Sequence, residues 1–281
     1  MSVKFTILGS GSSGNCAYLE TADARVLVDA GFSPLQIRKR LATIGRTPEN
    51  LTAILITHEH SDHISGLLGI ADKFHIPVYC NRGTQDGTVW AFKSKWASKK
   101  KPLLDGLDGT EQLKRKIDWR LFETGASFEV GDVSIETFSI PHDAQDPVGY
   151  LLRTAAGNFG FATDLGHVTK LVLDRIRAAN VLVLESNHDV KMLQDCPRRS
   201  WSLKQRILGR HGHLSNETAA ETAAQIMSAE LRQLYLAHLS RECNKAELAH
   251  RVMSDRLKKI GAIHVQMQIA AQDVPCQTLE L

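Results

Sequence analysis

Short apolar runs alternate with amphipathic segments along the whole chain. Segments with helical spacing follow Ser33-Pro34, start again near His63, follow Ser215 and cover residues 245–260. The runs with strand character are residues 4–8, 16–19, 26–28, 53–56, 133–138, 149–152, 159–162, 181–184 and 233–236. This interleaving, with no linker, repeat or low-complexity block, predicts an α/β fold in one domain over residues 1–281.

The pattern weakens between about residue 83 and residue 118. We interpret this stretch as a surface excursion, because it is too short to bury a core of its own. Composition agrees with a globular class: 43% of the 281 residues are hydrophobic and 23% are charged, which excludes a disordered, collagen-like or disulfide-scaffold chain. The net charge of +3 is too balanced to identify a nucleic-acid binder by itself.

The cysteines and the first residues of the chain indicate where in the cell the protein is located. The five cysteines are scattered and never in CxxC spacing, which favours a reducing environment and argues against a thiolate metal site. No apolar run approaches the roughly 18 residues of a membrane span. The first residues lack the pattern of a signal peptide. The sequence therefore predicts a cytoplasmic protein that does not enter the membrane.

A glycine-rich segment, residues 9–14, matches GxGxxG directly after a strand-like run. A dinucleotide-binding fold would continue into a helix and place an acidic residue about 20 positions later. Here the chain continues with strand character, and Asp29 comes only 15 residues after Gly14. We therefore predict a turn between strands, whose N–H groups are also suited to a substrate phosphate.

Twelve histidines are present, and three of them crowd into one segment. His58, His60, Asp62 and His63 form HxHxDH at the end of a strand-like run and the start of a helix. Imidazole and carboxylate are the ligands that suit zinc, manganese or iron ions. Four such groups exceed what one tetrahedral site takes from a short segment, so we predict two adjacent metal ions.

HxHxDH resembles the signature of the metallo-β-lactamase superfamily, and the order of elements resembles its αββα sandwich of two mixed sheets between helices. Each remaining ligand of that family has a counterpart after an apolar run: His142, Asp164 and His238. The resemblance implies that His58, His60 and His142 hold one metal ion. It implies that Asp62, His63 and His238 hold the other, with Asp164 bridging and a metal-bridging hydroxide as the nucleophile.

Later motifs resemble the nucleic-acid-processing branch of the superfamily, typified by ribonuclease Z. Glu185 ends a strand-like run, His213 lies in Gly-His-Leu-Ser-Asn, and His238 begins His-Leu-Ser. A departing ribose or deoxyribose oxygen needs a proton, which a histidine oriented by a carboxylate can supply. We therefore predict Glu185 and His213, together with Asp62, as catalytic residues.

The turn at residues 9–15 and the endings Gly-His-Leu-Ser-Asn and His-Leu-Ser-x-x-Asn are similar to the YycJ/WalJ group of small bacterial superfamily members. That resemblance implies a metal-dependent phosphodiesterase, specifically a 5′→3′ DNA exonuclease with two zinc or manganese ions (or iron). Two alternatives stay open: a small-molecule hydrolase of the glyoxalase II or lactonase type, and an RNA-processing nuclease of the ribonuclease Z type.

A basic stretch with two tryptophans covers residues 90–101. Trp90 or Trp96 could stack on a base while the lysines contact phosphates. A lysine run is equally typical of a solvated face with tryptophans packed inward. The sequence does not decide between the two interpretations.

Overall fold

The structure, a computed structural model, describes residues 2–98 and 109–281. Within these ranges the strands form two seven-stranded sheets. The first sheet has the order β14 (Leu279–Glu280), β1 (Lys4–Gly9), β2 (Cys16–Glu20), β3 (Arg25–Val28), β4 (Ala53–Leu55), β5 (Val78–Cys80) and β6 (Trp119–Leu121). The second has the order β13 (Gln266–Ile269), β12 (Gln233–Ala237), β11 (Val181–Glu185), β10 (Gly157–Ala162), β9 (Val148–Thr154), β8 (Val133–Ser139) and β7 (Ser127–Val130).

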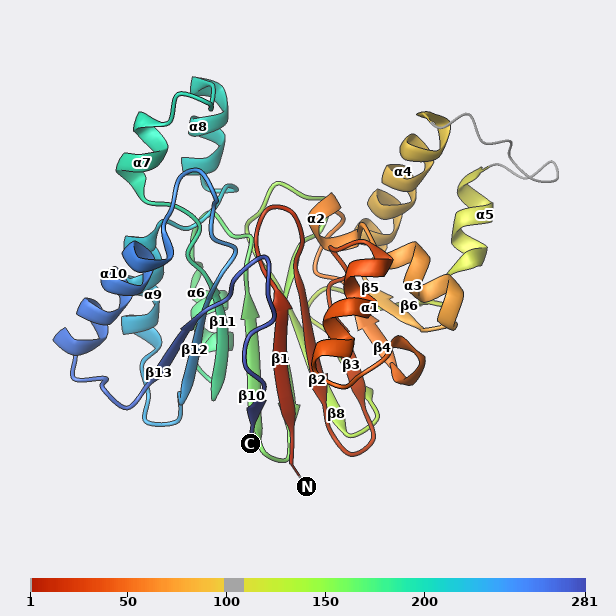
Figure 1. The fold of residues 1–281 in the computed structure, drawn as a ribbon, viewed down its shortest axis with the longest axis horizontal. Helices are drawn as coiled ribbons and strands as arrows, with labels where there is room; N and C mark the ends of the chain where they lie inside the picture. Colours follow the sequence, from red (N-terminus) through yellow and green to blue (C-terminus); the bar gives the residue numbers. More distant parts are fainter. Residues whose placement is uncertain (1, 99–108) are drawn as a thin grey trace.

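Helices accompany each sheet. Those of the first half are α1 (Pro34–Thr43), α2 (Ser61–Ile64), α3 (Leu67–Phe74), α4 (Arg82–Ser98) and α5 (Gly109–Lys116), with a single 3-10 turn at Pro48–Asn50. Those of the second half are α6 (Lys170–Ile176), α7 (Val190–Asp195), α8 (Trp201–Leu208), α9 (Asn216–Ile226) and α10 (Ala246–Lys259). The chain ends are close together, since β14 pairs antiparallel with β1 (Figure 1).

Three apolar layers hold the molecule together. The central layer lies between the two sheets, where the Phe5 ring contacts the rings of Phe159, Phe161 and Tyr235. A second layer lies between the second sheet and α6, α9 and α10, and a third lies between the first sheet and α1 and α3. Figure 1 shows the two helical layers on either side of the strands. The predicted αββα sandwich with two mixed sheets is therefore confirmed.

The glycine-rich segment is a turn, as predicted. It joins β1 to β2, which pair antiparallel, and β2 pairs antiparallel with β3. No helix opens after Gly14, because the chain enters β2 at Cys16. The structural context that a dinucleotide-binding motif requires is absent from this segment.

The helix expected near His63 is in fact two helices. The short α2 covers Ser61–Ile64, and α3 begins at Leu67 after an interruption at Gly66. The Gly66 N–H donates to the carbonyl of Ala30, and a Cβ at Gly66 would lie 2.1 Å from the Phe32 carbonyl oxygen. This close approach requires glycine and separates the two helices. Sequence reasoning also missed α4, α5, α7 and α8.

The strand directions explain where functional residues gather. β3 runs parallel to β4, and β10, β11 and β12 run parallel to one another. Ala162 pairs with Leu184, and Glu185 pairs with Ala237, so these three strands end side by side. Residues that follow them are brought to one edge of the molecule. Among the described residues, none of the helices has the length and apolar character to cross a membrane.

Replacing Phe5 with alanine should destabilise the protein strongly, because Phe5 is fully buried between the sheets. We expect the free energy of unfolding in urea to fall by about 3–5 kcal/mol. Trp90→Ala is the matched control, since this aromatic side chain on α4 is 71% exposed and should change stability by less than about 0.5 kcal/mol. Equal effects of the two substitutions would contradict the central position of Phe5.

Candidate metal centre and catalytic residues

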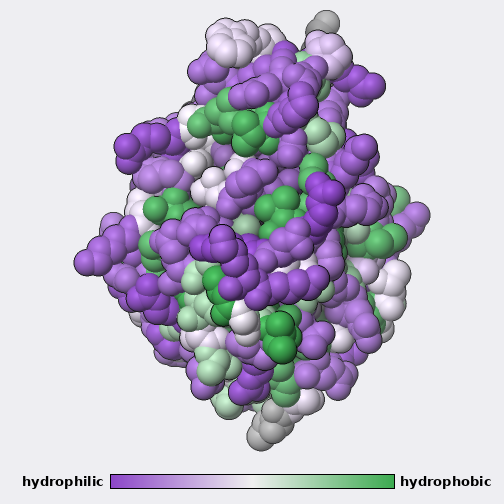
Figure 2. Space-filling model, turned by 90° about the vertical axis from the view of Figure 1, so that its left-hand side faces the viewer, coloured by the Kyte–Doolittle hydropathy of each residue, from purple (hydrophilic) through white to green (hydrophobic). Residues whose placement is uncertain are grey.

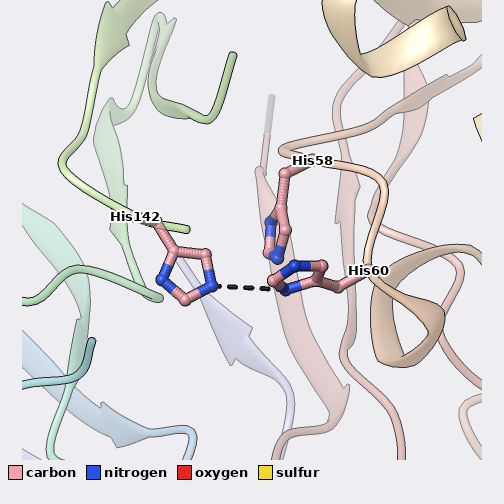
Figure 3. Close-up of side chains that lie close together, drawn as sticks. All are labelled: His58, His60 and His142. Carbon is pink, nitrogen blue, oxygen red and sulfur yellow. Dashed lines mark hydrogen bonds between the residues drawn. The ribbon is translucent and has the colours of Figure 1, made fainter. Parts of the chain in front are cut away.

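The HxHxDH segment turns sharply where β4 ends and α2 begins. His58 and His63 are fully buried, and His60 occupies the N-cap position of α2. His142 approaches from the loop after β8, and its Nε2 lies 3.3 Å from Nδ1 of His60. Figure 3 shows His58, His60 and His142 turned toward one another from these two loops. Three imidazoles far apart in the sequence therefore share one small volume.

The structure brings all the predicted ligands together. Among the described residues, four sets of donor atoms lie close enough to hold an ion: His58, His60 and His142; Asp62, His63 and His238; His58, His63 and Asp164; and Asp164, Glu185, His213 and His238. The first two sets are the two predicted ligand groups. Asp164 lies between them, with one carboxylate oxygen 3.3 Å from His63 Nε2 and the other 4.0 Å from His142 Nε2.

Four of the imidazoles are held through Nδ1 by a partner outside the two predicted ligand groups. These contacts are His63 with Asp29 Oδ2 at 2.7 Å, His58 with Thr57 Oγ1 at 3.0 Å, His142 with the Gly212 carbonyl at 3.2 Å, and His238 with Glu185 Oε1 at 2.9 Å. Carboxylate and carbonyl partners accept the Nδ1–H, so Nε2 carries the lone pair. These four histidines belong to the donor sets named above.

The donor chemistry fits divalent cations. Nε2 of His58 is buried and has no hydrogen-bond partner, although a buried ring nitrogen normally has one. Burial lowers the pKa of His63, but the carboxylates of Asp29, Asp164 and Asp62 outweigh it and raise that pKa well above its usual value. His238 behaves in the same way, with burial opposed by Asp164, Asp62 and Glu185. Burial instead lowers the pKa of His58 and His142, so these two imidazoles favour the neutral form that ligates a metal ion.

Backbone strain is concentrated at the same place. Asp29, Asp164 and His238 adopt left-handed conformations, with φ of 62°, 59° and 56°. Each follows a strand, β3, β10 or β12, at the edge where the ligands meet. Non-glycine residues rarely adopt this conformation, and it persists where the surrounding contacts determine it.

The carboxylate of Glu185 links four loops and is fully buried. Its Oε2 accepts the N–H of Leu165 and of Leu214, while its Oε1 lies 2.8 Å from Nδ1 of His213 and 2.9 Å from Nδ1 of His238. Burial alone would raise the pKa of Glu185, but His213 and His238 lower it to about 2. Glu185 therefore stays ionised and orients both histidines.

The glycine-rich turn contacts two histidines of the cluster. The side-chain carbonyl of Asn15 accepts from Ser10 Oγ and from the Gly11 N–H. Its amide group lies 3.1 Å from Nε2 of His63, and Ser10 Oγ also accepts the N–H of His238. The segment that resembled a nucleotide loop thus positions two metal-ligand candidates.

A buried amide network explains the two asparagines of the later motifs. Ser186 Oγ donates to Asn216 Oδ1, and the side chains of Asn216 and Asn244 hydrogen-bond each other at 2.9 Å. Asn244 also donates to the carbonyls of Ser186 and Asn187. These contacts lock together the loops that carry Glu185, His213 and His238.

A cavity of about 270 Å³ opens beside the cluster. His213, whose side chain is 21% exposed, lines it with His60, Asp62, His142 and His238. Because His213 uses Nδ1 for Glu185, its Nε2 is available on the cavity side. The remaining histidines near the motifs are not part of the cluster: His188 is buried, which lowers its pKa to about 4, and His167 contacts the Arg210 carbonyl.

The Lys/Trp stretch at residues 90–101 is only partly described. Trp90 is 71% exposed on α4, and residues 99–101 lie outside the described ranges. The described residues of this stretch do not line the cavity beside the metal cluster.

Comparison with known proteins now assigns the class. A family profile described as a beta-lactamase superfamily domain matches residues 24–239. The chain belongs to the metallo-beta-lactamase superfamily. Two solved structures share its fold. The metallo-beta-lactamase fold protein YhfI from Bacillus subtilis has a TM-score of 0.66 and 16% identity, and the match covers 100% of this chain and 99% of that one. Human tRNase Z, short form, has a TM-score of 0.61 and 18% identity, and the match covers 99% of both chains.

Two curated relatives are similar over almost their whole length. The chain is 40% identical over 254 residues to exodeoxyribonuclease WalJ of Streptococcus pneumoniae, covering 90% of this chain and 88% of that protein. It is 36% identical over 261 residues to exodeoxyribonuclease YycJ of Bacillus anthracis, covering 93% and 91%. The predicted resemblance to the YycJ/WalJ group is confirmed. So is the prediction of a metal-dependent hydrolase, because the chain combines these relatives with the superfamily's metal-binding residues.

Sequence reasoning missed the residues that hold the ligands in place. Asp29 was noted only as an acidic residue too close to the glycine-rich turn, and Thr57 was not singled out. Asp29 accepts from both the N–H and the hydroxyl of Thr57 as well as contacting His63. Its position directly after the strand-like run at residues 26–28 was the available clue, since the ligand candidates also follow strands.

Substituting Asp29 with asparagine should loosen metal binding without unfolding the protein. The uncharged amide no longer holds His63 through a charge-assisted hydrogen bond, and such outer partners typically contribute about 10–100-fold to metal affinity. Competition with a chelator, read by metal analysis of the desalted protein, measures the change. Asp118→Asn, at an exposed aspartate near β6, is the control, and unchanged affinity in Asp29→Asn would refute the assigned role.

Proposed function

We propose that this protein is a two-metal-dependent DNA exonuclease that hydrolyses phosphodiester bonds, with Zn²⁺ or Mn²⁺ as its ions. The observation that carries the proposal is its 36–40% identity, over about nine-tenths of the chain, to two proteins named exodeoxyribonucleases. The Glu185–His213 pair beside the metal-ligand cluster supports it. The 5′→3′ direction belongs to the proposal through the resemblance to the YycJ/WalJ group.

The proposed roles of the residues follow from their contacts. His58, His60 and His142 would hold one ion, and Asp62, His63 and His238 the other, with Asp164 between them. When bound, two divalent ions supply a deprotonated water and neutralise the phosphate. Asp62 helps to retain the second ion, and its Oδ2 lies 3.3 Å from His238 Nε2.

His213 is proposed as the general acid. Glu185 fixes its Nδ1, so that Nε2 faces the cavity and can protonate the departing sugar oxygen. The buried, ionised carboxylate of Glu185 holds the His213 ring in this orientation through the same contact. This arrangement suits phosphodiester substrates, whose leaving group is a poorly stabilised alkoxide.

End-labelled oligonucleotides test the proposal directly. Protein reconstituted with Mn²⁺ or Zn²⁺ should degrade DNA from its 5′ end. A strand labelled at the 3′ end should therefore give a ladder of progressively shorter labelled products. Excess EDTA should abolish the reaction. Turnover of RNA alone would favour the ribonuclease Z alternative. Intact DNA and RNA with turnover of a thioester or lactone would favour the glyoxalase II or lactonase alternative and refute the nuclease.

Replacing His213 with alanine should lower kcat on DNA by about 10²–10⁴-fold, because a positioned general acid contributes that much. Metal content should stay at two ions per chain, since His213 is not among the predicted ligands. His264→Ala removes an exposed histidine that contacts the Ser228 carbonyl and should leave kcat unchanged. Loss of bound metal in His213→Ala would show that His213 is a ligand rather than the acid.

A further inference from the structure

A helical hairpin overhangs the metal cluster. It consists of α7 and α8, and we call residues 190–208 the cap. Four buried side chains, Leu193, Cys196, Ile207 and Cys243, pack together and attach the cap to the loop that follows His238. The Asp189 N–H donates to the Cys243 carbonyl and strengthens the attachment. Figure 1 shows α7 and α8 projecting beyond the ends of the strands.

The cap forms one wall of the cavity beside the metal cluster. The opposite wall is made by the proposed ligands, and the cap contributes Leu193, Arg199, Leu203, Arg206 and Ile207. In α8, residues 203, 206 and 207 follow helical spacing and so lie on one face. A substrate that reaches the metal cluster through this cavity must therefore contact that face of α8.

Positive charge is concentrated on this part of the chain. Residues 190–211 contain six lysines and arginines and one aspartate, whereas the whole protein has a net charge of only +3. Hydrophilic side chains dominate the side of the molecule on which α7 and α10 lie, and apolar ones form separate patches there (Figure 2). Carboxylates of Asp143, Asp195 and Glu242 pair with four of these cations, so the groups that a polyanion would meet are the guanidinium groups at the cavity.

Two of these cations line the cavity. Arg206 Nε lies 2.6 Å from Asp143 Oδ2, and the Arg206 side chain is 60% exposed. Arg199 is largely buried, and its Nε lies 3.4 Å from Glu242 Oε2 without forming a hydrogen bond. Both guanidinium groups thus stand at the cavity with hydrogen-bonding capacity left for an anion.

We propose that the cap is a binding subsite for one nucleotide of a single DNA strand, next to the linkage that the metal centre cleaves. Arg199 and Arg206 receive its phosphate, and the partly buried Leu203 on the same face of α8 receives the sugar and the face of the base. A cavity of about 270 Å³ is close to the lower limit of ligand pockets, roughly 300 Å³, so it suits one nucleotide and not a duplex. Aliphatic contacts do not distinguish bases, so binding at this subsite is independent of sequence.

The exposed Trp201 is not part of this subsite. It precedes Leu203 by two residues, which places it about half a helical turn away, on the opposite side of α8. Its side chain is 71% exposed and does not line the cavity. The subsite rests on the proposed nuclease function, but it can be tested independently through nucleotide binding.

The test compares Arg206→Gln with Lys191→Gln. Lys191 is a cation of the same cap, paired with Asp195 on α7, and it does not line this cavity. Three quantities are measured for each variant: KM for a single-stranded oligodeoxynucleotide, the dissociation constant of thymidine 5′-monophosphate, and kcat/KM for methyl p-nitrophenyl phosphate. The last substrate requires the metal centre but has no nucleotide to fill the subsite.

For Arg206→Gln we expect KM and the nucleotide dissociation constant to rise about ten-fold, the effect of losing a hydrogen bond between charged groups. Hydrolysis of methyl p-nitrophenyl phosphate should stay unchanged. Arg206→Lys, which retains the charge, should restore part of the binding. Lys191→Gln should leave all three quantities close to those of the wild type.

If KM and the nucleotide dissociation constant rise equally in Arg206→Gln and Lys191→Gln, the proposed subsite is wrong, because the effect would then reflect the overall charge of the cap. A parallel loss of methyl p-nitrophenyl phosphate hydrolysis would also overturn it, since Arg206 would then act through Asp143 and the metal ligand beside it. If the wild type leaves DNA intact, the proposed function fails. The subsite is then decided by the nucleotide titration alone: it stands if Arg206→Gln weakens binding of the monophosphate and falls if the wild type binds none.

Discussion

The buried carboxylate of Glu185 is the contact on which the rest of the site depends. One of its oxygens accepts two backbone N–H groups, from Leu165 and Leu214, and the other orients His213 and His238. A buried charge is costly unless it is fully paired, and here the partners come from three loops: Leu165 from one, the adjacent His213 and Leu214 from another, and His238 from a third. The loops are therefore stable only in the arrangement that satisfies this carboxylate, which is also the arrangement that turns the imidazoles toward the metal centre.

Much of the fold and the donor set could be predicted from sequence because both are local in the chain. Apolar runs marked most of the strands of the two sheets, and each distant ligand candidate, His142, Asp164 and His238, directly follows such a run. The resemblance to the superfamily singled out these residues, and the geometry agrees with it, because strands that run in the same direction end at the same edge and bring the residues that follow them together. The HxHxDH segment needed even less, since its four side chains lie within six positions.

The residues that hold the donors could not be predicted in the same way. Asp29 reaches His63 across 34 positions, and Asn15 reaches it across 48, through backbone conformations that sequence patterns do not reveal. Helices α7 and α8 were also missed, because they are short and their apolar side chains face a cavity and a small cluster instead of a sheet. Periodicity identifies a helix packed on the main core, and the cap does not pack there.

The strand ends and the cap therefore differ in what they contribute to the protein. The strand ends hold donors whose positions are fixed by the sheets, and that geometry suits an invariant hydrolytic step. The cap is attached by a few buried side chains and by the loop after His238, and it carries none of the predicted metal ligands. Substrate preference within one superfamily would then be set mainly by such peripheral segments, because the metal centre itself is compatible with lactams, thioesters and phosphodiesters. The nearly neutral net charge of this chain does not reveal that two arginines of the cap, Arg199 and Arg206, line the cavity beside the proposed metal ligands.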